Sequence, residues 1–299
     1  MPAAIHTEDL TRDFGTLRAL DSLDLDVGEG EIFGFLGPNG AGKSTAIRLM
    51  LDFIRPTRGR AAIHGHDCQA QSMDVRRIVG FLPGDIRLYP ALTGRQTIDF
   101  FAGMRGIPVE NSGALDIAHR LELRLDVKAG TYSKGNRQKL GLVLALMGGP
   151  RVLVLDEPSS GLDPLNQHAL WELLRERARD GVTVFFSSHV MSEVEMVCER
   201  VGILRKGQLV ATETVSQMKS KALRHLVVRF DGSPPAAEAF AMEGVRELRR
   251  EQSIIEFEVQ GDLDPMVKAL AQHYVVDIAS EQPTLEELLM SFYAREDAT

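Results

Sequence analysis

The residues with the most specific chemistry form a glycine-rich loop that matches the phosphate-binding pattern G-x-x-x-x-G-K-[ST]. Its members are Gly37, Pro38, Asn39, Gly40, Ala41, Gly42, Lys43, Ser44 and Thr45. A short apolar segment precedes the loop and an amphipathic helical pattern follows it, as such a loop requires. Glycines let backbone N–H groups surround a phosphate, Lys43 suits the β and γ oxygens, and the Ser44 hydroxyl suits Mg²⁺. The loop therefore predicts binding of a nucleoside triphosphate.

Two adjacent carboxylates, Asp156 and Glu157, directly follow an apolar run at 152–155. Such a run is typical of a parallel strand that is covered on both faces. Two acids at the carboxyl edge of a parallel sheet are costly unless a positive or reactive group lies opposite them. We predict that Asp156 holds Mg²⁺, directly or through water, and that Glu157 polarises the water that attacks the γ-phosphate.

A third motif occupies residues 132–138, directly before an apolar helix predicted at 140–147. Ser133 is a natural N-cap, so this helix would present an N-terminus that can receive an anion. A serine and a glycine before a helix usually indicate only a cap. The motif gains weight from its position between the glycine-rich loop and the two carboxylates.

The elements around these motifs indicate a doubly wound α/β core. Apolar runs of the parallel-strand kind occur at 152–155 and 182–186, with a helix between them. Residues 1–30 alternate as the strands of an antiparallel sheet do. Further predicted elements are short strands at 61–64 and 78–82 and, within a mainly helical insertion over 85–150, helices at 97–104 and 114–123.

A change of composition after about residue 220 predicts a second, small domain over 224–299. Its elements follow the order βαββαβ, which is that of the ferredoxin-like sandwich. They are a strand at 225–230, a helix at 234–242, strands at 245–249 and 254–259, a helix at 265–272 and a strand at 275–278. A linker is predicted at 216–223 and a closing amphipathic helix at 285–293.

Composition narrows the class of protein. The net charge of −8 argues against a nucleic-acid partner, because proteins that bind nucleic acids usually have basic surfaces. The two cysteines, Cys68 and Cys198, fit free thiols in a reducing compartment. The longest nearly apolar run, 140–149, is about half of the roughly 20 residues that a spanning helix needs, and the N-terminus shows no export signal. We therefore expect a cytoplasmic protein that meets a membrane only through a partner.

Taken together, the motifs GPNGAGKST, YSKGNRQ, LVLDEPSSGLDP and FFSSH resemble, in order and spacing, those of the ATPase subunit of an ATP-binding-cassette (ABC) transporter. The resemblance covers residues 1 to about 220. It implies an α/β P-loop NTPase core with an antiparallel β subdomain and a helical subdomain at about 85–150. The ferredoxin-like α+β domain at 224–299 would be an addition to that core.

The resemblance also implies roles for single residues. Phe14 matches the aromatic that stacks on adenine, although a plain core phenylalanine is the alternative. Ser133 and Gly135 match groups that touch the γ-phosphate across a dimer interface, and His189 matches a histidine near that phosphate. Asp163 matches the loop that links the two sites. Two copies would face each other head to tail, with ATP and Mg²⁺ between one copy's phosphate loop and the other copy's Ser133.

The sequence departs from the family pattern near both ends of the helical insertion. Gly84 stands where the family usually has a glutamine that senses the metal and the membrane partner. We hypothesise that Asp85 substitutes through a water or that coupling relies on backbone motion. Lys134 replaces a glycine and Asn136 a glutamine. Lys134 could bind the γ-phosphate or face solvent, and the sequence leaves both open.

The tail narrows the transporter class, because residues 281–288 resemble the end of bacterial drug and lipid exporter ATPases of the daunorubicin-resistance type. The resemblance implies a peripheral subunit on the cytoplasmic face of the membrane that powers a separate permease exporting drugs, antibiotics or lipids. The alternatives are an importer ATPase and a soluble, non-transport ABC ATPase. The tail itself would be a dimerisation or regulatory module, or a passive cap.

Overall fold

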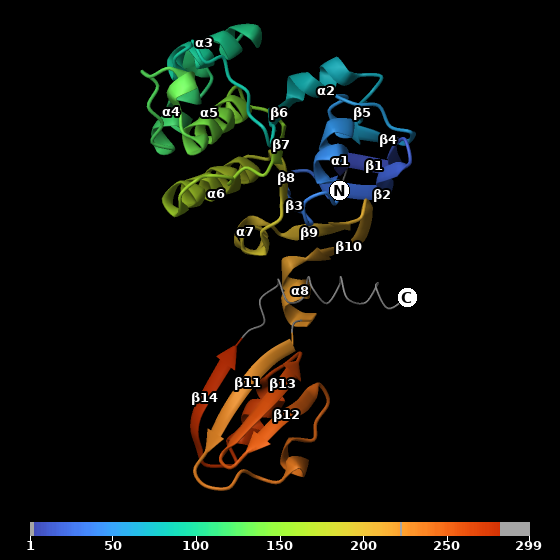
Figure 1. The fold of residues 1–299 in the computed structure, drawn as a ribbon, viewed down its shortest axis with the longest axis vertical. Coiled ribbons are helices and arrows are strands. Elements are labelled where there is room, and N and C mark those ends of the chain that lie inside the picture. The colour runs from blue at the N-terminus through green and yellow to red at the C-terminus, as the bar shows by residue number, and fades with distance from the viewer. Residues whose placement is uncertain (1–2, 222, 282–299) are drawn as a thin grey trace. The chain divides into compact units, whose positions relative to one another are not determined.

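The computed structural model describes residues 3–221 and 223–281 of the chain. These residues belong to two compact units, Met1–Thr212 and Glu213–Thr299 (Figure 1). Each unit has its own sheets and its own buried core. In the described residues, no helix is both long and apolar enough to cross a membrane.

The first sheet of the larger unit is antiparallel, with the strand order β2-β1-β4-β5. In β2, Leu23, Leu25 and Val27 are buried while Asp24 and Asp26 between them are exposed, which is the alternation of a sheet with one covered face. This confirms the antiparallel pattern predicted for the first 30 residues. The strands are β1 (Ala3–Phe14), β2 (Leu17–Gly28), β4 (Arg58–Ile63) and β5 (His66–Asp67).

The second sheet of the larger unit has six strands in the order β10-β9-β3-β8-β7-β6. From β9 to β6, neighbouring strands are parallel. All residues of β3, β7 and β8 are buried, as the continuous apolar runs predict for a sheet covered on both faces. The strands are β3 (Ile32–Leu36), β6 (Val79–Leu82), β7 (Val152–Asp156), β8 (Thr183–Ser188), β9 (Arg200–Arg205) and β10 (Gln208–Thr214).

Helices surround and interrupt this sheet. A mainly helical segment enters after β6 and returns at β7, its parallel neighbour, and its helices α3, α4 and α5 lie together, away from β1 and β2 (Figure 1). The inserted elements are α3 (Gly94–Met104), η1 (Val109–Asn111), α4 (Ala114–Arg120), η2 (Ala129–Thr131) and α5 (Lys134–Leu146). The other helices of this unit are α1 (Lys43–Met50), α2 (Ser72–Ile78), α6 (Pro164–Arg179) and α7 (Met191–Val197).

The core of the larger unit joins its two sheets across α1. Phe185 of β8 stacks on Phe33 at 5.9 Å between ring centroids and lies 5.2 Å from Phe35, both in β3. Leu23 of β2 and Ile47 of α1 belong to the same buried cluster. This packing fixes the end of β3, and therefore the loop that follows it, relative to β7 and β8.

The smaller unit contains one antiparallel sheet with the order β12-β13-β11-β14. One face carries a buried cluster that includes Phe240, Phe257 and Met266. The elements are α8 (Val215–Lys221), β11 (Leu223–Phe230), η3 (Ala237–Phe240), β12 (Val245–Glu251), β13 (Ile254–Gln260), α9 (Asp264–Leu270) and β14 (Val275–Glu281). The strand order is that of a ferredoxin-like sandwich, as predicted.

One predicted helix is wrong, and one helix of the structure was not predicted. The helix predicted at 234–242 is only the short 3₁₀ turn η3, because Pro234 and Pro235 restrict its start and only Phe240 of the turn is buried. The helix α2 was not predicted, because Val75 is its only buried residue and no apolar stripe marks it. The predicted closing helix at 285–293 lies outside the described residues.

Candidate active site

The glycine-rich loop connects the buried strand β3 to the N-terminus of α1. Gly42 is the N-cap of α1 and has φ of 110°, a left-handed conformation that favours glycine. A Cβ atom at Gly37 would collide with the carbonyl oxygen of Leu204, and one at Gly42 would lie 2.5 Å from that of Ala19. These two positions therefore need glycine for the loop to pass between β2 and β9 and to bring the positive end of α1 to its surface.

The side chain of Lys43 folds back over the loop. Its Nζ donates hydrogen bonds to the carbonyl oxygens of Gly37, at 2.6 Å, and Pro38, at 3.1 Å. Burial lowers the pKa of Lys43, and the nearby carboxylates of Glu157 and Asp156 oppose that shift. A buried ammonium that has only carbonyl oxygens as partners is suited to exchange them for charged phosphate oxygens, which are stronger acceptors.

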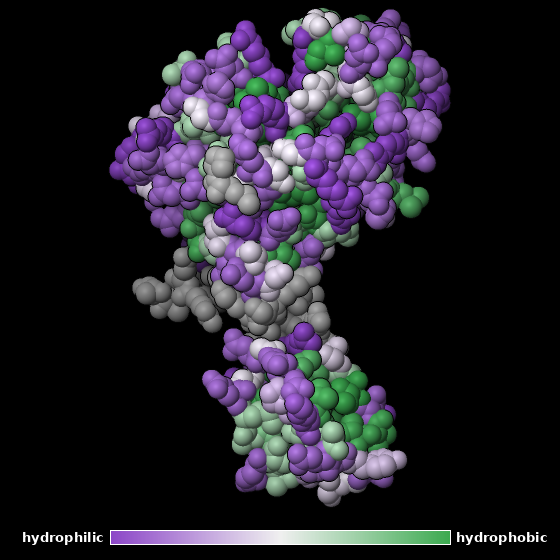
Figure 2. Space-filling model, turned by 180° about the vertical axis from the view of Figure 1, so that it is seen from behind, coloured by the Kyte–Doolittle hydropathy of each residue, from purple (hydrophilic) through white to green (hydrophobic). Residues whose placement is uncertain are grey.

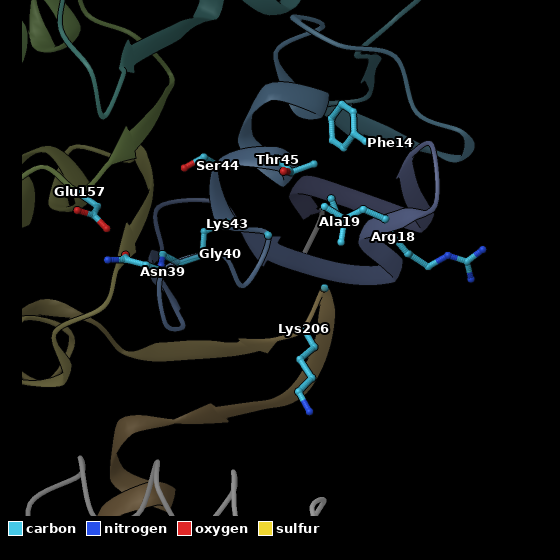
Figure 3. Close-up of a pocket in the computed structure, with 13 residues that line it drawn as sticks. Phe14, Arg18, Ala19, Asn39, Gly40, Lys43, Ser44, Thr45, Glu157 and Lys206 are labelled. Carbon is cyan, nitrogen blue, oxygen red and sulfur yellow. The ribbon is translucent and has the colours of Figure 1, made fainter.

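The loop forms the floor of a cavity of about 540 Å³. In Figure 3, Glu157 and Phe14 lie at opposite ends of this cavity, with the loop between them and the Ser44 side chain directed toward the Glu157 end. The lining residues are Phe14, Leu17, Arg18, Ala19, Asn39, Gly40, Gly42, Lys43, Ser44, Thr45, Glu157, Lys206 and Gly207. The cavity thus has a polar end, at Glu157, and an aromatic end, at Phe14.

Phe14 occupies the tip of the β1–β2 hairpin and is 44% exposed. The guanidinium carbon of Arg12 lies 4.5 Å from the centroid of its ring and covers one face. Phe14 is therefore not part of the core, which was the alternative that the sequence left open. Its position fits a stacking surface for a planar base, and that role stays a prediction.

Asp156 ends β7, Glu157 follows it, and both share one partner, Ser187 of β8. Ser187 Oγ donates to Asp156 Oδ1 at 2.5 Å, and the Glu157 amide donates to Ser187 Oγ at 3.1 Å and to its carbonyl oxygen at 3.2 Å. His189 Nδ1 lies 3.0 Å from Glu157 Oε1. The structure thus brings the predicted metal ligand, general base and histidine together at the carboxyl ends of two adjacent strands.

The residues at this end fit a magnesium ion that is shared with phosphate. The described residues contain no group of three or more His, Cys, Asp or Glu side chains able to hold a metal alone. Mg²⁺ usually takes one or two protein oxygens and completes its shell with phosphate and water. Asp156 and the Ser44 hydroxyl offer such oxygens, so they would hold the ion when ATP is present.

Gly84 faces Asp156 across the end of the sheet. A Cβ atom at this position would lie 3.2 Å from Asp156 Oδ2, so a longer side chain here would reach the carboxylate. The carboxylate of Asp85 is 81% exposed and bonds to Arg87 at 3.2 Å, and Asp85 does not line the cavity. The geometry therefore gives no support to the hypothesis that Asp85 replaces the missing glutamine.

Ser133 and Gly135 lie at the N-terminus of α5 and outside the cavity lining. Ser133 Oγ caps α5 by accepting from the Asn136 amide at 3.2 Å. Lys134, for which the sequence left two roles open, donates from Nζ to Ser160 Oγ at 2.8 Å. In this structure Lys134 therefore joins the start of α5 to the loop that follows β7.

Asp163 caps the next helix, α6. Its Oδ1 accepts from the Asn166 amide at 3.0 Å and its Oδ2 from the Asn166 side chain at 2.6 Å. The hydrogen bonds from the backbone and side chain of Asn166 lower the pKa of Asp163. Asp163 also lies outside the cavity lining, so its predicted part in linking two sites stays a prediction.

Sequence reasoning missed the residues that reach the cavity from distant strands. Arg18 lies on β2, and Lys206 and Gly207 form the turn between β9 and β10. The Gly207 amide donates to the carbonyl oxygen of Ala41 at 2.9 Å, which brings the turn against the phosphate loop. Only Arg18, four residues from Phe14, had a local signal that could have identified it.

Comparison with known proteins assigns the family. Residues 20–160 match the family described as "ABC transporter". The chain is 35% identical over 230 residues to the bacitracin transport ATP-binding protein BcrA of Bacillus licheniformis, covering 76% of this chain and 74% of BcrA. It is 36% identical over 222 residues to the probable multidrug ABC transporter ATP-binding protein YbhF of Escherichia coli, covering 73% of this chain and 38% of YbhF.

The fold gives the same answer as the sequence comparison. A solved structure titled "Structure of ATP binding subunit of ABC transporter" superposes with a TM-score of 0.68 at 29% identity, covering 72% of this chain and 92% of that one. The chain therefore belongs to the family of ATP-binding subunits of ABC transporters.

Proposed function

We propose that this chain hydrolyses ATP as a head-to-tail dimer and thereby powers a separate membrane permease. One observation carries the proposal. The cavity contains Phe14, Lys43 and Glu157, but Ser133 and Gly135 lie outside it. One copy therefore offers only part of the predicted site, and the N-terminus of α5 from a second copy would close it over the triphosphate.

The residues divide the chemistry between them. Lys43 exchanges the carbonyl oxygens of Gly37 and Pro38 for the β and γ oxygens of ATP. Ser44 and Asp156 would hold a magnesium ion, which would supply positive charge beside the phosphates. Glu157 accepts a proton from the attacking water as general base. His189, which already bonds to Glu157 Oε1, holds that carboxylate in place.

Turnover and assembly of the same variants test the proposal. Wild-type protein should release phosphate from ATP, and Glu157→Gln should not. Light scattering should show that Glu157→Gln forms a dimer with ATP and Mg²⁺ and a monomer after the nucleotide is removed. A Glu157→Gln variant that stays monomeric at saturating ATP would contradict the shared site.

An apolar groove of about 550 Å³ between α3, α5 and β6 supports contact with a permease. It includes Phe53 and Met104, which are exposed, and three arginines. The arginines are Arg76, Arg87 and Arg105. Apolar side chains with arginines among them suit an amphipathic segment with acidic residues, so we propose that the permease presents such a segment here.

The groove is tested with a matched pair of substitutions. Met104→Asp lies in the groove, whereas Met73→Asp places the same change at another exposed methionine that does not line it. Met104→Asp should reduce the amount of permease that co-purifies with the chain in detergent, and Met73→Asp should not. Equal recovery with both variants would place the permease elsewhere.

We propose export of drugs, antibiotics or lipids as the direction and cargo class. Two relatives support this choice, since BcrA is a bacitracin transport protein and YbhF a probable multidrug transporter protein. In inside-out membrane vesicles that contain the chain and its permease, added ATP should drive a drug into the vesicle lumen. Loss of preloaded drug from the same vesicles would indicate import.

A further inference from the structure

The backbone of Glu157 has a conformation that its own residue type does not favour. Its φ is 50°, in the left-handed region, where residues other than glycine are strained. Such a conformation persists only where surrounding contacts impose it. The amide side of Glu157 is held by Ser187, as described above, and the carbonyl side must be held by something else.

Gln138, in the second turn of α5, holds that carbonyl side. Its Nε2 donates to the carbonyl oxygen of Glu157 at 3.0 Å and to that of Pro158 at 2.9 Å. Gln138 is only 4% exposed, so water cannot easily replace the two hydrogen bonds. Gln138 thus holds two consecutive peptide units, Glu157–Pro158 and Pro158–Ser159, through one side-chain amide.

Glu193, in the first turn of α7, ties the two catalytic segments together. Its Oε2 accepts from Ser188 Oγ at 2.6 Å, and its Oε1 accepts from Ser159 Oγ. Ser188 directly precedes His189, and Ser159 comes two residues after Glu157. One carboxylate therefore fixes the distance between the segments that carry Glu157 and His189.

We propose that Gln138 and Glu193 are positioning residues for ATP hydrolysis, which hold the Glu157 carboxylate within hydrogen-bond reach of His189. The inference rests on the proposed role of Glu157 as general base. Neither Gln138 nor Glu193 lines the nucleotide cavity. Their loss should therefore lower the rate of the chemical step and leave nucleotide binding nearly unchanged.

Methionine substitutions test both residues, because methionine matches their length and offers no strong hydrogen-bonding group. We expect Gln138→Met and Glu193→Met to lower kcat by about 10- to 100-fold, since a misplacement of about 1 Å can cost about 100-fold. The Kd for ATP, measured by fluorescence titration, should change by less than about twofold. Both variants are measured with the full chain at saturating Mg²⁺.

Two variants control for lost packing and lost hydrogen bonds of the same kind. Gln69 Nε2 donates to the carbonyl oxygen of Leu49 at 3.2 Å, and Glu31 Oε2 accepts from the Gly28 amide at 2.7 Å. Neither residue lines the cavity. Gln69→Met and Glu31→Met should lower the melting temperature by a similar amount while kcat stays near the wild-type value.

A pH profile separates positioning from packing at Gln138. In Gln138→Glu, the introduced carboxylate faces two carbonyl oxygens and cannot donate, but its protonated form can donate to one of them. The kcat of Gln138→Glu relative to Gln138→Met should therefore rise as the pH falls from about 8 to about 6, because this environment raises the pKa of the introduced carboxyl. A constant ratio would indicate that the site needs only volume at this position.

The hydroxyl that donates to Glu193 provides a second test, because a change from serine to alanine removes a hydrogen bond and little volume. Ser159→Ala removes one of the hydroxyls that Glu193 accepts from. Combined with Glu193→Met, it should add no further loss of kcat, because the shared contact is already gone. An independent, additive loss would show that Glu193 does not act through Ser159.

The outcomes separate this inference from the proposed function. If Glu157→Gln turns over ATP at the wild-type rate, the general base is wrong and both proposals fail. If Glu157→Gln is inactive while Gln138→Met and Glu193→Met keep wild-type kcat, only the positioning role is wrong. A loss of kcat in both methionine variants at unchanged Kd, with the two control variants unaffected, supports it.

Discussion

The two units contain sheets that differ in both architecture and chemistry. In the six-stranded sheet, β3, β7 and β8 are buried throughout, and reactive side chains gather only where strands end. In the sheet of the smaller unit, one face packs on an apolar core and the other carries charged residues such as Arg246, Glu256 and Glu258. The parallel sheet therefore gathers its reactive side chains at the carboxyl ends of its strands, whereas the antiparallel sheet spreads polar groups over a whole face.

The exposed surfaces of the two units also differ. On the face drawn in Figure 2, the larger unit is mostly hydrophilic, whereas the smaller unit shows a greater share of hydrophobic residues. Tyr274, Val276 and Ile278, at and before β14, are exposed. If the chemistry lies only at the carboxyl ends of the parallel strands, substitutions there should change ATP turnover. Substitutions in the smaller unit should instead change the stability of that unit.

The largest expected effect on turnover is that of Glu157→Gln. Removing a general base lowers a rate by about 100- to 10,000-fold, because the attacking water then keeps its proton. Phosphate release from ATP at saturating substrate measures the effect. Glu256→Gln, on the charged face of the small sheet, is the control and should turn over at the wild-type rate. A similar loss in both variants would show that the contrast between the sheets is wrong.

Lys43→Met should have the next largest effect, this time on nucleotide affinity. Hydrogen bonds to charged groups contribute about 1.5–3 kcal/mol, which corresponds to a roughly 10- to 100-fold weaker Kd for ATP. Because burial lowers the pKa of Lys43, the empty site is a costly place for an ammonium. We therefore expect Lys43→Met to melt at a higher temperature than wild type without nucleotide, and to gain almost nothing from added ATP in differential scanning fluorimetry.

Gly84→Gln should have a smaller effect, because it adds an interaction near the magnesium ligand. The Cβ atom would lie 3.2 Å from Asp156 Oδ2, so the new amide can reach that carboxylate. One hydrogen bond contributes about 0.5–1.5 kcal/mol, so we expect turnover in the presence of the permease to change by about two- to tenfold. Asp85→Ala, whose parent side chain is exposed, should leave turnover unchanged, and a loss there would restore the water-mediated role.

Local patterns allowed much of this site to be predicted. The phosphate loop, Asp156, Glu157 and the Ser133 cap each depend on a few consecutive residues, and the structure places them at strand ends or helix starts. Gln138 is the last residue of the motif at 132–138, but that motif indicated no contact with Glu157, and Glu193 belongs to no motif. Their importance comes from contacts with Glu157 and Ser159, which are 19 and 34 residues away in the sequence.

The fold follows the same rule. Strands with regular alternation or continuous apolar runs were predicted, because those patterns follow directly from burial on one or two faces. The helix α2 was not predicted and η3 was predicted as a longer helix, because each buries a single residue, Val75 or Phe240. An element that buries one side chain has no period, so sequence spacing cannot define it.

Phe257→Ala should leave turnover unchanged and destabilise the smaller unit. Phe257 is fully buried and its ring centroid lies 5.0 Å from that of Phe240. Removing a buried phenylalanine side chain costs about 3–5 kcal/mol, through lost burial and the cavity left behind. Hydrogen exchange should rise in β11 and β13 and not in β3 or β7. A matching loss of protection in β7 would show that the two units unfold together.

The smallest effect is expected from Asp163→Asn, which keeps a cap on α6 but removes its charge. Hydrogen bonds from Asn166 hold the pKa of Asp163 below its usual value, so the folded state favours the ionised form. This contribution to stability is complete above the unfolded pKa of about 3.9 and is lost as the pH falls through the lower, folded value. Asparagine is as good an N-cap as aspartate, so melting temperatures at pH 7 should differ by only about a degree or two.

The two proteins should differ in how their melting temperatures respond to acid. Wild type should lose stability more steeply than Asp163→Asn below about pH 4, because only the wild-type cap takes up a proton. Melting curves recorded at closely spaced pH values would detect the difference in slope. Parallel curves would show that Asp163 titrates as it does in the unfolded chain, and that the Asn166 contacts do not persist in solution.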